Sequence, residues 1–142
     1  MYKYIYFDLD DTLIRDNPIT GKSEILQSGF ETYERMNIEY PNTPKILFTN
    51  RIKGEIKYPD NYSFSDVVGR EDMEEYITKN IKKVKLSSLF SLKNLYIFIR
   101  GYILFKNNST PKLLYIFLKH SKDIKNILIF DDDRRVSGIF WG

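Results

Sequence analysis

The sequence predicts a single α/β domain built around a mostly parallel central sheet. Three short runs of aromatic and β-branched residues have the length of buried strands, and segments with a helical apolar period lie between them. The 142 residues, 42% hydrophobic and 29% charged, can bury one core and have the composition of a globular protein. Because no repeat, low-complexity tract or long linker divides residues 1–142, we expect one domain.

The first third of the chain predicts a strand, a helix and a second strand. Residues 2–7 (YKYIYF) form the first strand, and a polar loop over 15–22 follows. From Ser23, apolar residues keep a helical period until the Pro41–Pro44 break. The run KILF at 45–48 is the second strand. Strand, helix, strand is the unit from which parallel sheets are built.

The middle of the chain gives less regular signals. Residues 52–65 are rich in turn formers, and an apolar stripe with helical spacing runs from Gly69 to Val84. Residues 95–105 contain two apolar runs that flank Arg100-Gly101. This pattern predicts either a β-hairpin or one bent strand.

A helix and a strand are predicted near the end of the chain. Thr110 is the expected N-cap, Pro111 takes the first helical position, and Lys112 lies in the first turn. His120, near the end of this helix, is expected to act as a charge partner of the helix C-terminus. The run NILIF at 126–130 is the last predicted strand.

Polar side chains follow each of the three predicted strands at the point where the strand ends. These clusters are Asp8–Thr12, Thr49–Arg51 and Asp131–Asp133. In an open parallel sheet the carboxyl ends of the strands share one edge, where ligands bind. Lys112, at a helix N-terminus, can face the same edge. The sequence therefore predicts that these clusters converge on one site.

The residue types in these clusters are those that phosphoryl transfer needs. Carboxylates at one edge are tolerated when a hard cation such as Mg²⁺ lies among them. Thr49, Asn50 and Lys112 are donors of the kind that bind phosphate oxygens. Asp8 is the natural nucleophile, because a carboxylate can form an aspartyl-phosphate. Asp10 could protonate the leaving group and then activate water, while Lys112 neutralises charge on the transferring group.

In these motifs the chain resembles the haloacid dehalogenase (HAD) superfamily of phosphatases. YIYFDLDDTLI is similar to its first motif, with Asp8, Asp10 and Thr12 in the conserved places of DxDxT. KILFTN with Thr49, STPK with Lys112, and NILIFDDD are similar to the second, third and fourth motifs.

The resemblance implies a Rossmann-like three-layer core, Mg²⁺ dependence, and Asp8 as the nucleophile. Asp10 favours hydrolysis of phosphate esters over the family's other reactions. The metal would be held by Asp8, the backbone carbonyl of Asp10 and one residue of the fourth motif. Asp132 is the favoured ligand there and Asp131 the alternative, with Asp133 behind them or as a cap for the helix at Arg134.

The spacing of the motifs departs from the larger members of this family. Only a loop and a helix lie between Thr12 and the second strand, so no large cap domain fits there, and at most a hairpin-sized insertion fits within about 86–109. Members without a cap tend to act on macromolecules, so the expected substrate is a phosphoprotein, a nucleic-acid end or a nucleotide. FTNR resembles the FTN of polynucleotide 3′-phosphatases, and the lysine-rich segment 79–125 would suit nucleic acid. A solvated helix face is the simpler explanation of those lysines.

A second hypothesis is a catalytically degenerate HAD fold that serves as a binding or regulatory module. Residues 134–142 are too few for the terminal strand and helix of the family, which motivates this hypothesis. The intact acidic residues and Lys112 argue against it.

Composition also excludes some classes of protein. Without cysteine the chain has neither disulfides nor Cys-ligated zinc. Acidic residues from Asp8 onward do not fit a signal peptide. The longest apolar stretch, 95–105, contains Arg100 and is far shorter than the roughly 20 residues of a membrane span. We therefore expect an intracellular, cytoplasmic protein without a membrane partner.

Overall fold

A parallel sheet of four strands forms the centre of the structure, which confirms the predicted α/β class. In this computed structural model the backbone of residues 1–141 and the side chains of residues 1–137 are described. The sheet order is β5-β4-β1-β6, and every neighbouring pair is parallel. Its strands are β1 (Tyr4–Phe7), β4 (Lys45–Phe48), β5 (Asp66–Val68) and β6 (Ile127–Phe130).

The register brings the carboxyl ends of the central strands to the same edge of the sheet. Phe7 at the end of β1 lies between Leu47 of β4 and Phe130 of β6. The polar clusters that follow these strands therefore leave the sheet side by side.

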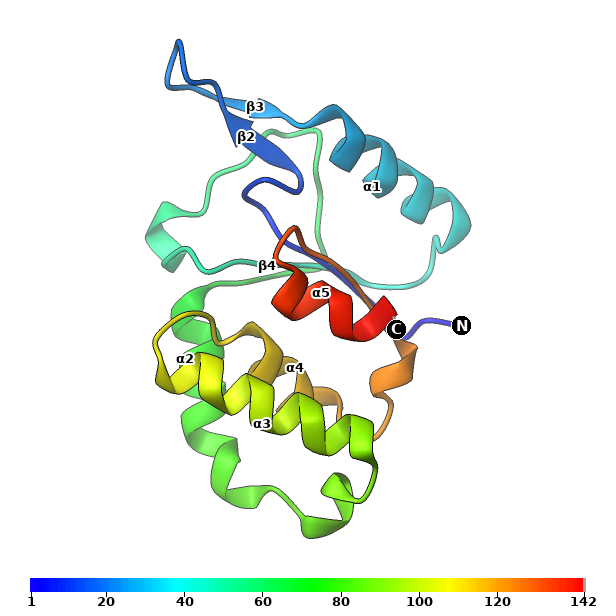
Figure 1. Cartoon of the computed structure of the whole chain (residues 1–142). Helices are drawn as coiled ribbons and strands as arrows, with labels where there is room; N and C mark the ends of the chain where they lie inside the picture. Colours follow the sequence, from blue (N-terminus) through cyan, green and yellow to red (C-terminus); the bar gives the residue numbers. More distant parts are fainter. Residues whose placement is uncertain (142) are drawn as a thin grey trace.

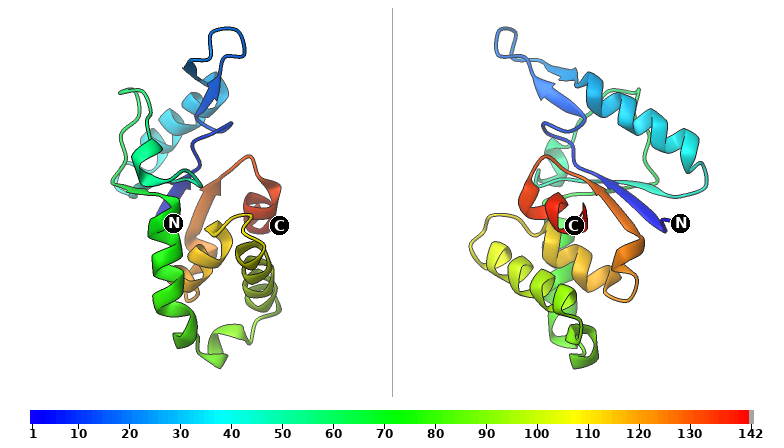
Figure 2. Two further views of the ribbon diagram at one scale, coloured as in Figure 1. Left: turned by 90° about the vertical axis from the view of Figure 1, so that its left-hand side faces the viewer. Right: turned by 45° about the vertical axis from the view of Figure 1, so that its right-hand side comes forward.

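Helices cover both faces of the sheet, giving a Rossmann-like three-layer sandwich (Figures 1 and 2). Tyr6 and Phe48 point into the core formed with the helices of one face, whereas Phe7 and Leu47 point to α1 on the other. This alternation follows from the two-residue period of a strand. The helices are α1 (Gln27–Glu39), α2 (Arg70–Asn80), α3 (Leu92–Lys106), α4 (Lys112–His120) and α5 (Arg134–Trp141). Short 3₁₀ helices are η1 (Lys53–Glu55), η2 (Ile81–Lys83), η3 (Leu86–Leu89) and η4 (Ile124–Asn126).

A two-stranded hairpin, β2 (Ile14–Asp16) and β3 (Ser23–Ile25), projects from the core between β1 and α1 (Figure 1). The prediction of a loop over 15–22 and a helix from Ser23 is therefore wrong at both junctions. The strands have only three residues each, and their outer residues are exposed. Such short strands give no alternating apolar pattern in the sequence.

The predicted hairpin or bent strand over 95–105 is wrong, because this segment lies in the 15-residue helix α3. Gly101 is not a turn residue. A Cβ atom on Gly101 would lie 2.8 Å from the backbone nitrogen of Leu114, so glycine allows α3 to pack closely against α4. Because α3 has apolar residues on both its buried and its exposed face, its sequence contains runs of consecutive apolar residues like those of a strand. In the described part of the chain no helix is both long and apolar enough to cross a membrane.

His120 is buried at the end of α4, which contradicts its expected role as a charge partner. Its Nε2 atom is 2.7 Å from the hydroxyl oxygen of Tyr6, and only 6% of the residue is exposed. Burial, with Lys119 nearby, lowers the pKa of His120 to about 4. The imidazole is therefore neutral near pH 7 and shares one hydrogen bond with the Tyr6 hydroxyl.

Candidate functional site

One pocket of about 210 Å³ at the carboxyl edge of the sheet brings together all seven predicted site residues. It is lined by Asp8, Asp10, Asp11, Thr49, Asn50, Lys112, Asp131, Asp132 and Asp133. These residues come from the ends of β1, β4 and β6 and from the first turn of α4. The structure thus brings the scattered polar clusters together, and their chemical roles stay predictions.

Lys112 forms the centre of the site. Its Nζ atom lies 2.6 Å from Asp8 Oδ1 and 2.7 Å from Asp131 Oδ2. The ammonium group is also 4.6 Å from the centre of the Phe48 ring, and only 2% of Lys112 is exposed. α4 begins at Lys112, one residue later than predicted, and Pro111 instead of Thr110 is its N-cap residue. Thr110 Oγ1 still accepts a hydrogen bond from the Lys112 backbone nitrogen.

Burial and mutual repulsion act on the two carboxylates beside Lys112. Burial raises the pKa of Asp8 to about 8, with Lys112 opposing this effect and Asp131 adding to it. Burial also raises the pKa of Asp131, again against the influence of Lys112. Burial alone would lower the pKa of Lys112, but the two carboxylates outweigh it and raise that pKa. The lysine is therefore charged and favours the ionised form of Asp8, and a cation bound beside Asp8 would favour it further.

The carboxylates of the site could hold a metal ion. Asp8, Asp131 and Asp132 each offer an oxygen atom, and these atoms lie within 4.8 Å of one another. Such an all-oxygen donor set fits a hard divalent cation. Both oxygens of Asp131 already accept hydrogen bonds, one from Lys112 and one from the backbone nitrogen of Asp133. Asp132 is exposed, so its carboxylate is the more accessible of the two.

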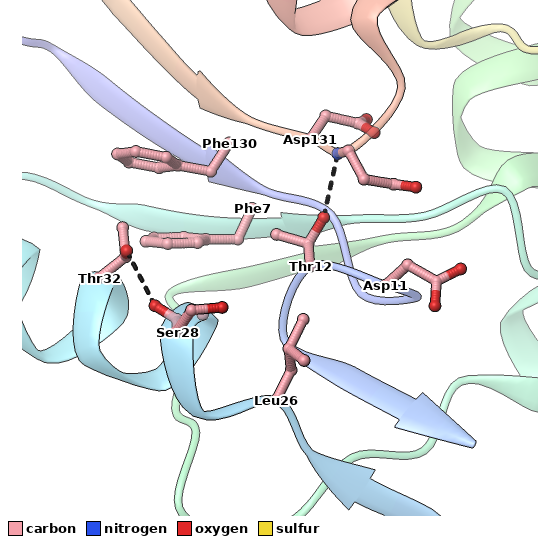
Figure 3. Close-up of a pocket in the computed structure, with 10 residues that line it drawn as sticks. Phe7, Asp11, Thr12, Leu26, Ser28, Thr32, Phe130 and Asp131 are labelled. Atoms are coloured by element: carbon pink, nitrogen blue, oxygen red, sulfur yellow. Dashed lines mark hydrogen bonds between the residues drawn. The ribbon is translucent and has the colours of Figure 1, made fainter. Parts of the chain in front are cut away.

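Thr12 connects the ends of β1 and β6. Its hydroxyl donates to Asp8 Oδ2 over 3.3 Å. The same hydroxyl accepts from the backbone nitrogen of Asp132 over 3.2 Å (Figure 3). These hydrogen bonds tie the Asp8 carboxylate to the backbone at Asp132. Asp11, just before Thr12, adopts a left-handed conformation with φ of 60°, and its exposed side chain lies 3.9 Å from Arg15.

Arg51 is a site residue whose role the sequence did not reveal. Its guanidinium donates from Nε to Asp10 Oδ2 over 2.8 Å and from Nη2 to the other carboxylate oxygen. The hydrogen bond to Asp10 raises the pKa of Arg51, and Nη1 donates to the backbone oxygen of Glu55. This two-point contact fixes the orientation of Asp10. The only sequence signal is that Arg51 directly follows Thr49-Asn50.

Thr49 and Asn50 connect β4 to the other parts of the site. Thr49 is 1% exposed, and its Oγ1 accepts a hydrogen bond from the backbone nitrogen of Arg51. Asn50 Oδ1 accepts from the hydroxyl of Thr110 over 2.9 Å, just before the start of α4. The end of β4 is therefore fixed to the segment that carries Lys112.

Asp133 acts as the cap of α5, one of the two roles expected for it. Its Oδ1 atom accepts a hydrogen bond from the backbone nitrogen of Arg135 over 3.0 Å. The capped nitrogen is therefore one residue later than that of Arg134, which the sequence predicted. Hydrogen bonds from the Arg135 side chain also hold the pKa of Asp133 below its usual value.

A second hollow of about 280 Å³ adjoins the carboxylates on the α1 side of the sheet (Figure 3). It shares Asp11, Asp131 and Asp132 with the first pocket. Phe7 and Phe130 form its apolar side, with stacked rings whose centres are 5.1 Å apart. The hollow offers room for an apolar or planar group next to the carboxylates.

Comparisons of the chain with protein-family models, with curated proteins and with solved structures found no match. The likeness to HAD phosphatases therefore depends on the motifs and on the arrangement of their residues in this pocket.

Proposed function

We propose that the protein is a Mg²⁺-dependent phosphohydrolase that cleaves phosphate monoesters through an aspartyl-phosphate on Asp8. The observation that carries the proposal is the buried Lys112 ammonium between Asp8 and Asp131, with Asp132 completing a cluster of three carboxylates. A cation and a metal-binding carboxylate cluster around one potential nucleophile are the parts that phosphoryl transfer requires.

Asp8, Asp131 or Asp132, and the Asp10 carbonyl would hold the metal, with Asp132 the favoured ligand. When bound, Mg²⁺ supplies positive charge that keeps the carboxylates ionised and offsets the charge of the phosphate oxygens. Lys112 is already in contact with Asp8, so its ammonium also lies close to any phosphoryl group that Asp8 attacks. Thr49 and Asn50 add hydrogen-bonding groups in the same pocket.

The reaction proceeds in two displacements at phosphorus. An Asp8 oxygen forms a bond to phosphorus while the bond to the leaving oxygen breaks, and Asp10 gives its proton to that oxygen. Asp10 then takes a proton from a water molecule whose oxygen attacks the aspartyl-phosphate. This second step releases inorganic phosphate and restores the Asp8 carboxylate. Arg51 orients Asp10 for both proton transfers.

The proposed substrate is a phosphorylated macromolecule or a nucleotide, with a 3′-phosphorylated nucleic-acid end as one candidate. Asp10 has 47% of its side chain exposed, and the hollow beside Phe7 and Phe130 extends the site along α1. Both features favour a leaving group that stays partly outside the pocket.

Hydrolysis of an aryl phosphate with and without Mg²⁺ tests the proposal. We expect wild-type activity to require the metal, and Asp8→Asn to abolish it. Asp60→Asn is the matched control, since it removes an exposed carboxylate that lines neither pocket and should retain activity within a few-fold. If the substrate is nucleic acid, kcat/KM on phosphorylated oligonucleotides falls steeply with added salt.

The alternative, a degenerate binding or regulatory module, predicts a different result. Wild-type protein would then be as inert as Asp8→Asn on aryl phosphates, phosphorylated oligonucleotides and phosphopeptides, with or without metal. That result would overturn the proposed activity.

A further inference from the structure

The outer face of α3 carries a continuous apolar stripe. Six residues with helical spacing form this α3 stripe: Leu92, Leu95, Tyr96, Ile99, Tyr102 and Ile103. Their exposed fractions run from 36% at Leu95 to 86% at Leu92. On the opposite face of the helix, Ile97 and Leu104 are buried against the rest of the protein.

Two further apolar side chains extend the α3 stripe beyond the start of the helix. Leu86 in η3 is 74% exposed, and Phe90, just before α3, is 78% exposed. Asn94 ties this region to α4, since its Nδ2 atom donates to the backbone oxygens of Ser88 and Ser121. Contiguous exposed apolar surface of this kind marks an interaction site in a soluble protein.

The α3 stripe lies on the outside of the helical layer. The left view of Figure 2 shows α4 between α2 and α3, so α3 is an outer helix of this layer and its exposed face points away from α4. An exposed apolar helix face can insert into the interface of a lipid bilayer.

The segment of the chain that contains the α3 stripe carries charges of one sign. No Asp or Glu occurs between Glu75 and Asp123, whereas Lys82, Lys93 and Lys106 lie within this segment. A second copy of the chain would bring this basic rim against itself without an acidic partner from the same segment. The charge pattern therefore favours an anionic surface over self-association.

A basic pocket adjoins the same region and fits anionic headgroups. Its volume is about 220 Å³, and Lys83, Lys85 and Lys122 line it together with Ser88 and Ser121. Ammonium and hydroxyl groups are donors that phosphate and carboxylate oxygens accept. Because Lys85 directly precedes Leu86 and Ser88 follows two residues later, a headgroup in this pocket would lie close to an inserting side chain.

We propose that the α3 stripe, with Leu86 and Phe90, docks on a membrane surface rich in anionic phospholipid. The apolar side chains enter the interface, and the surrounding lysines contact the lipid headgroups. The helix lies on the bilayer and does not span it. This revises the expectation of no membrane partner, which considered only whether 95–105 could span a bilayer and noted that it is too short and contains Arg100. Catalysis plays no part in this proposal.

Sedimentation of the full chain with lipid vesicles tests it. We expect binding to vesicles of phosphatidylcholine mixed with phosphatidylserine, little binding to phosphatidylcholine alone, and weakening with added salt. Phe90→Glu/Leu92→Glu should lower partitioning about tenfold or more, because each side chain loses its apolar transfer energy.

Ile19→Glu/Ile38→Glu is the matched control. Ile19 and Ile38 are 92% and 79% exposed and lie outside the α3 stripe. The two substitutions change the net charge by the same amount as Phe90→Glu/Leu92→Glu. This variant should bind like wild type, and circular dichroism verifies that both double variants fold.

Wild type that stays in solution with anionic vesicles at low salt overturns the proposal. A dimer that dissociates only in Phe90→Glu/Leu92→Glu, without vesicle binding, assigns the α3 stripe to a second copy instead. Capture of an acidic amphipathic peptide without vesicle binding likewise contradicts it.

Discussion

The ammonium group of Lys112 lies 2.6 Å from a carboxylate oxygen of Asp8, although the two residues are 104 positions apart in the chain. The side chains are 3% and 8% exposed, so both charges are largely removed from water. Each charge is tolerated because the other is present, and Asp131 completes the arrangement from the end of β6. The contact therefore combines a structural role with the proposed catalytic one.

Replacing Lys112 with glutamine should destabilise the protein strongly. The change leaves Asp8 and Asp131 buried without a counter-charge, which typically costs about 3–5 kcal/mol in the free energy of unfolding. Denaturant unfolding without metal measures this loss. Lys119→Gln, on the same helix, is the control. Lys119 contacts Tyr115, and no carboxylate of the described residues forms an ion pair with it, so its loss should cost about 1 kcal/mol or less. Equal effects of the two substitutions would contradict the role of Lys112 as a buried counter-charge.

Asp132→Asn should weaken Mg²⁺ binding more than it weakens the fold. Its carboxylate is the accessible member of the cluster, so we expect the Kd for Mg²⁺ to rise about tenfold or more. Titration calorimetry measures this Kd. At pH 7 the binding to wild type should also release protons, since burial raises the pKa of metal-free Asp8 to about 8.

Asp131→Asn is the informative comparison for that experiment. Both Asp131 oxygens take part in hydrogen bonds within the protein, so this substitution should lower stability even without metal. If Asp132→Asn binds Mg²⁺ like wild type while Asp131→Asn does not, Asp131 is the direct ligand and the preference stated above is wrong.

Arg51→Gln should impair hydrolysis of alkyl phosphates more than that of aryl phosphates. Arg51 orients Asp10, and a poor leaving group depends on the proton that Asp10 supplies, whereas an aryl oxide leaves without it. The ratio of kcat/KM on the two substrates measures this difference. Arg70→Gln, which removes an arginine near Glu74 outside the pocket, should leave the ratio unchanged. An unchanged ratio in Arg51→Gln would exclude action through Asp10.

The stability of the protein should depend on the protonation of His120 in mildly acidic solution. An unfolded histidine binds a proton below about pH 6.5, but the buried imidazole stays neutral until the pH approaches its lowered pKa of about 4. Between these values the unfolded state binds more protons, so the free energy of unfolding falls as the pH falls. This one group contributes up to about 3 kcal/mol.

Unfolding at a series of pH values, compared between wild type and His120→Gln, isolates this contribution from that of the carboxylates. The difference in stability between the two proteins should shrink as the pH drops from 6.5 to 4. A constant difference over that window would show that the buried imidazole does not titrate as described.

The sequence contained enough to predict the edge of the sheet where the site lies. β1, β4 and β6 are runs of apolar residues that are buried on both faces, and such runs stand out without an alignment. Since parallel strands end at one edge, the convergence of Asp8, Thr49 and Asp131 followed from topology alone. Lys112 followed from its place at the first turn of a helix.

The features that were missed depend on contacts between distant segments. The Arg51–Asp10 contact needs the orientation of two loops, and neither residue signals the other in the sequence. Gly101 looked like a turn because its partner, the backbone of Leu114, is invisible until α3 and α4 pack together. The two apolar runs of the same segment looked like strands, because α3 has apolar residues on its exposed face as well as on its buried face.

Detection of a phosphorylated Asp8 tests the central claim most directly. Asp10→Asn would be mixed with Mg²⁺ and an aryl phosphate, quenched in acid, digested and analysed by mass spectrometry. The aryl group leaves without a proton from Asp10, but hydrolysis of the intermediate needs Asp10 as base, so the phosphoenzyme should accumulate. We predict one phosphoryl group on the peptide that contains Asp8, and none in the Asp8→Asn/Asp10→Asn double variant. Turnover by wild type with no phosphoryl group on that peptide in Asp10→Asn, or with one on another residue, would contradict Asp8 as the nucleophile.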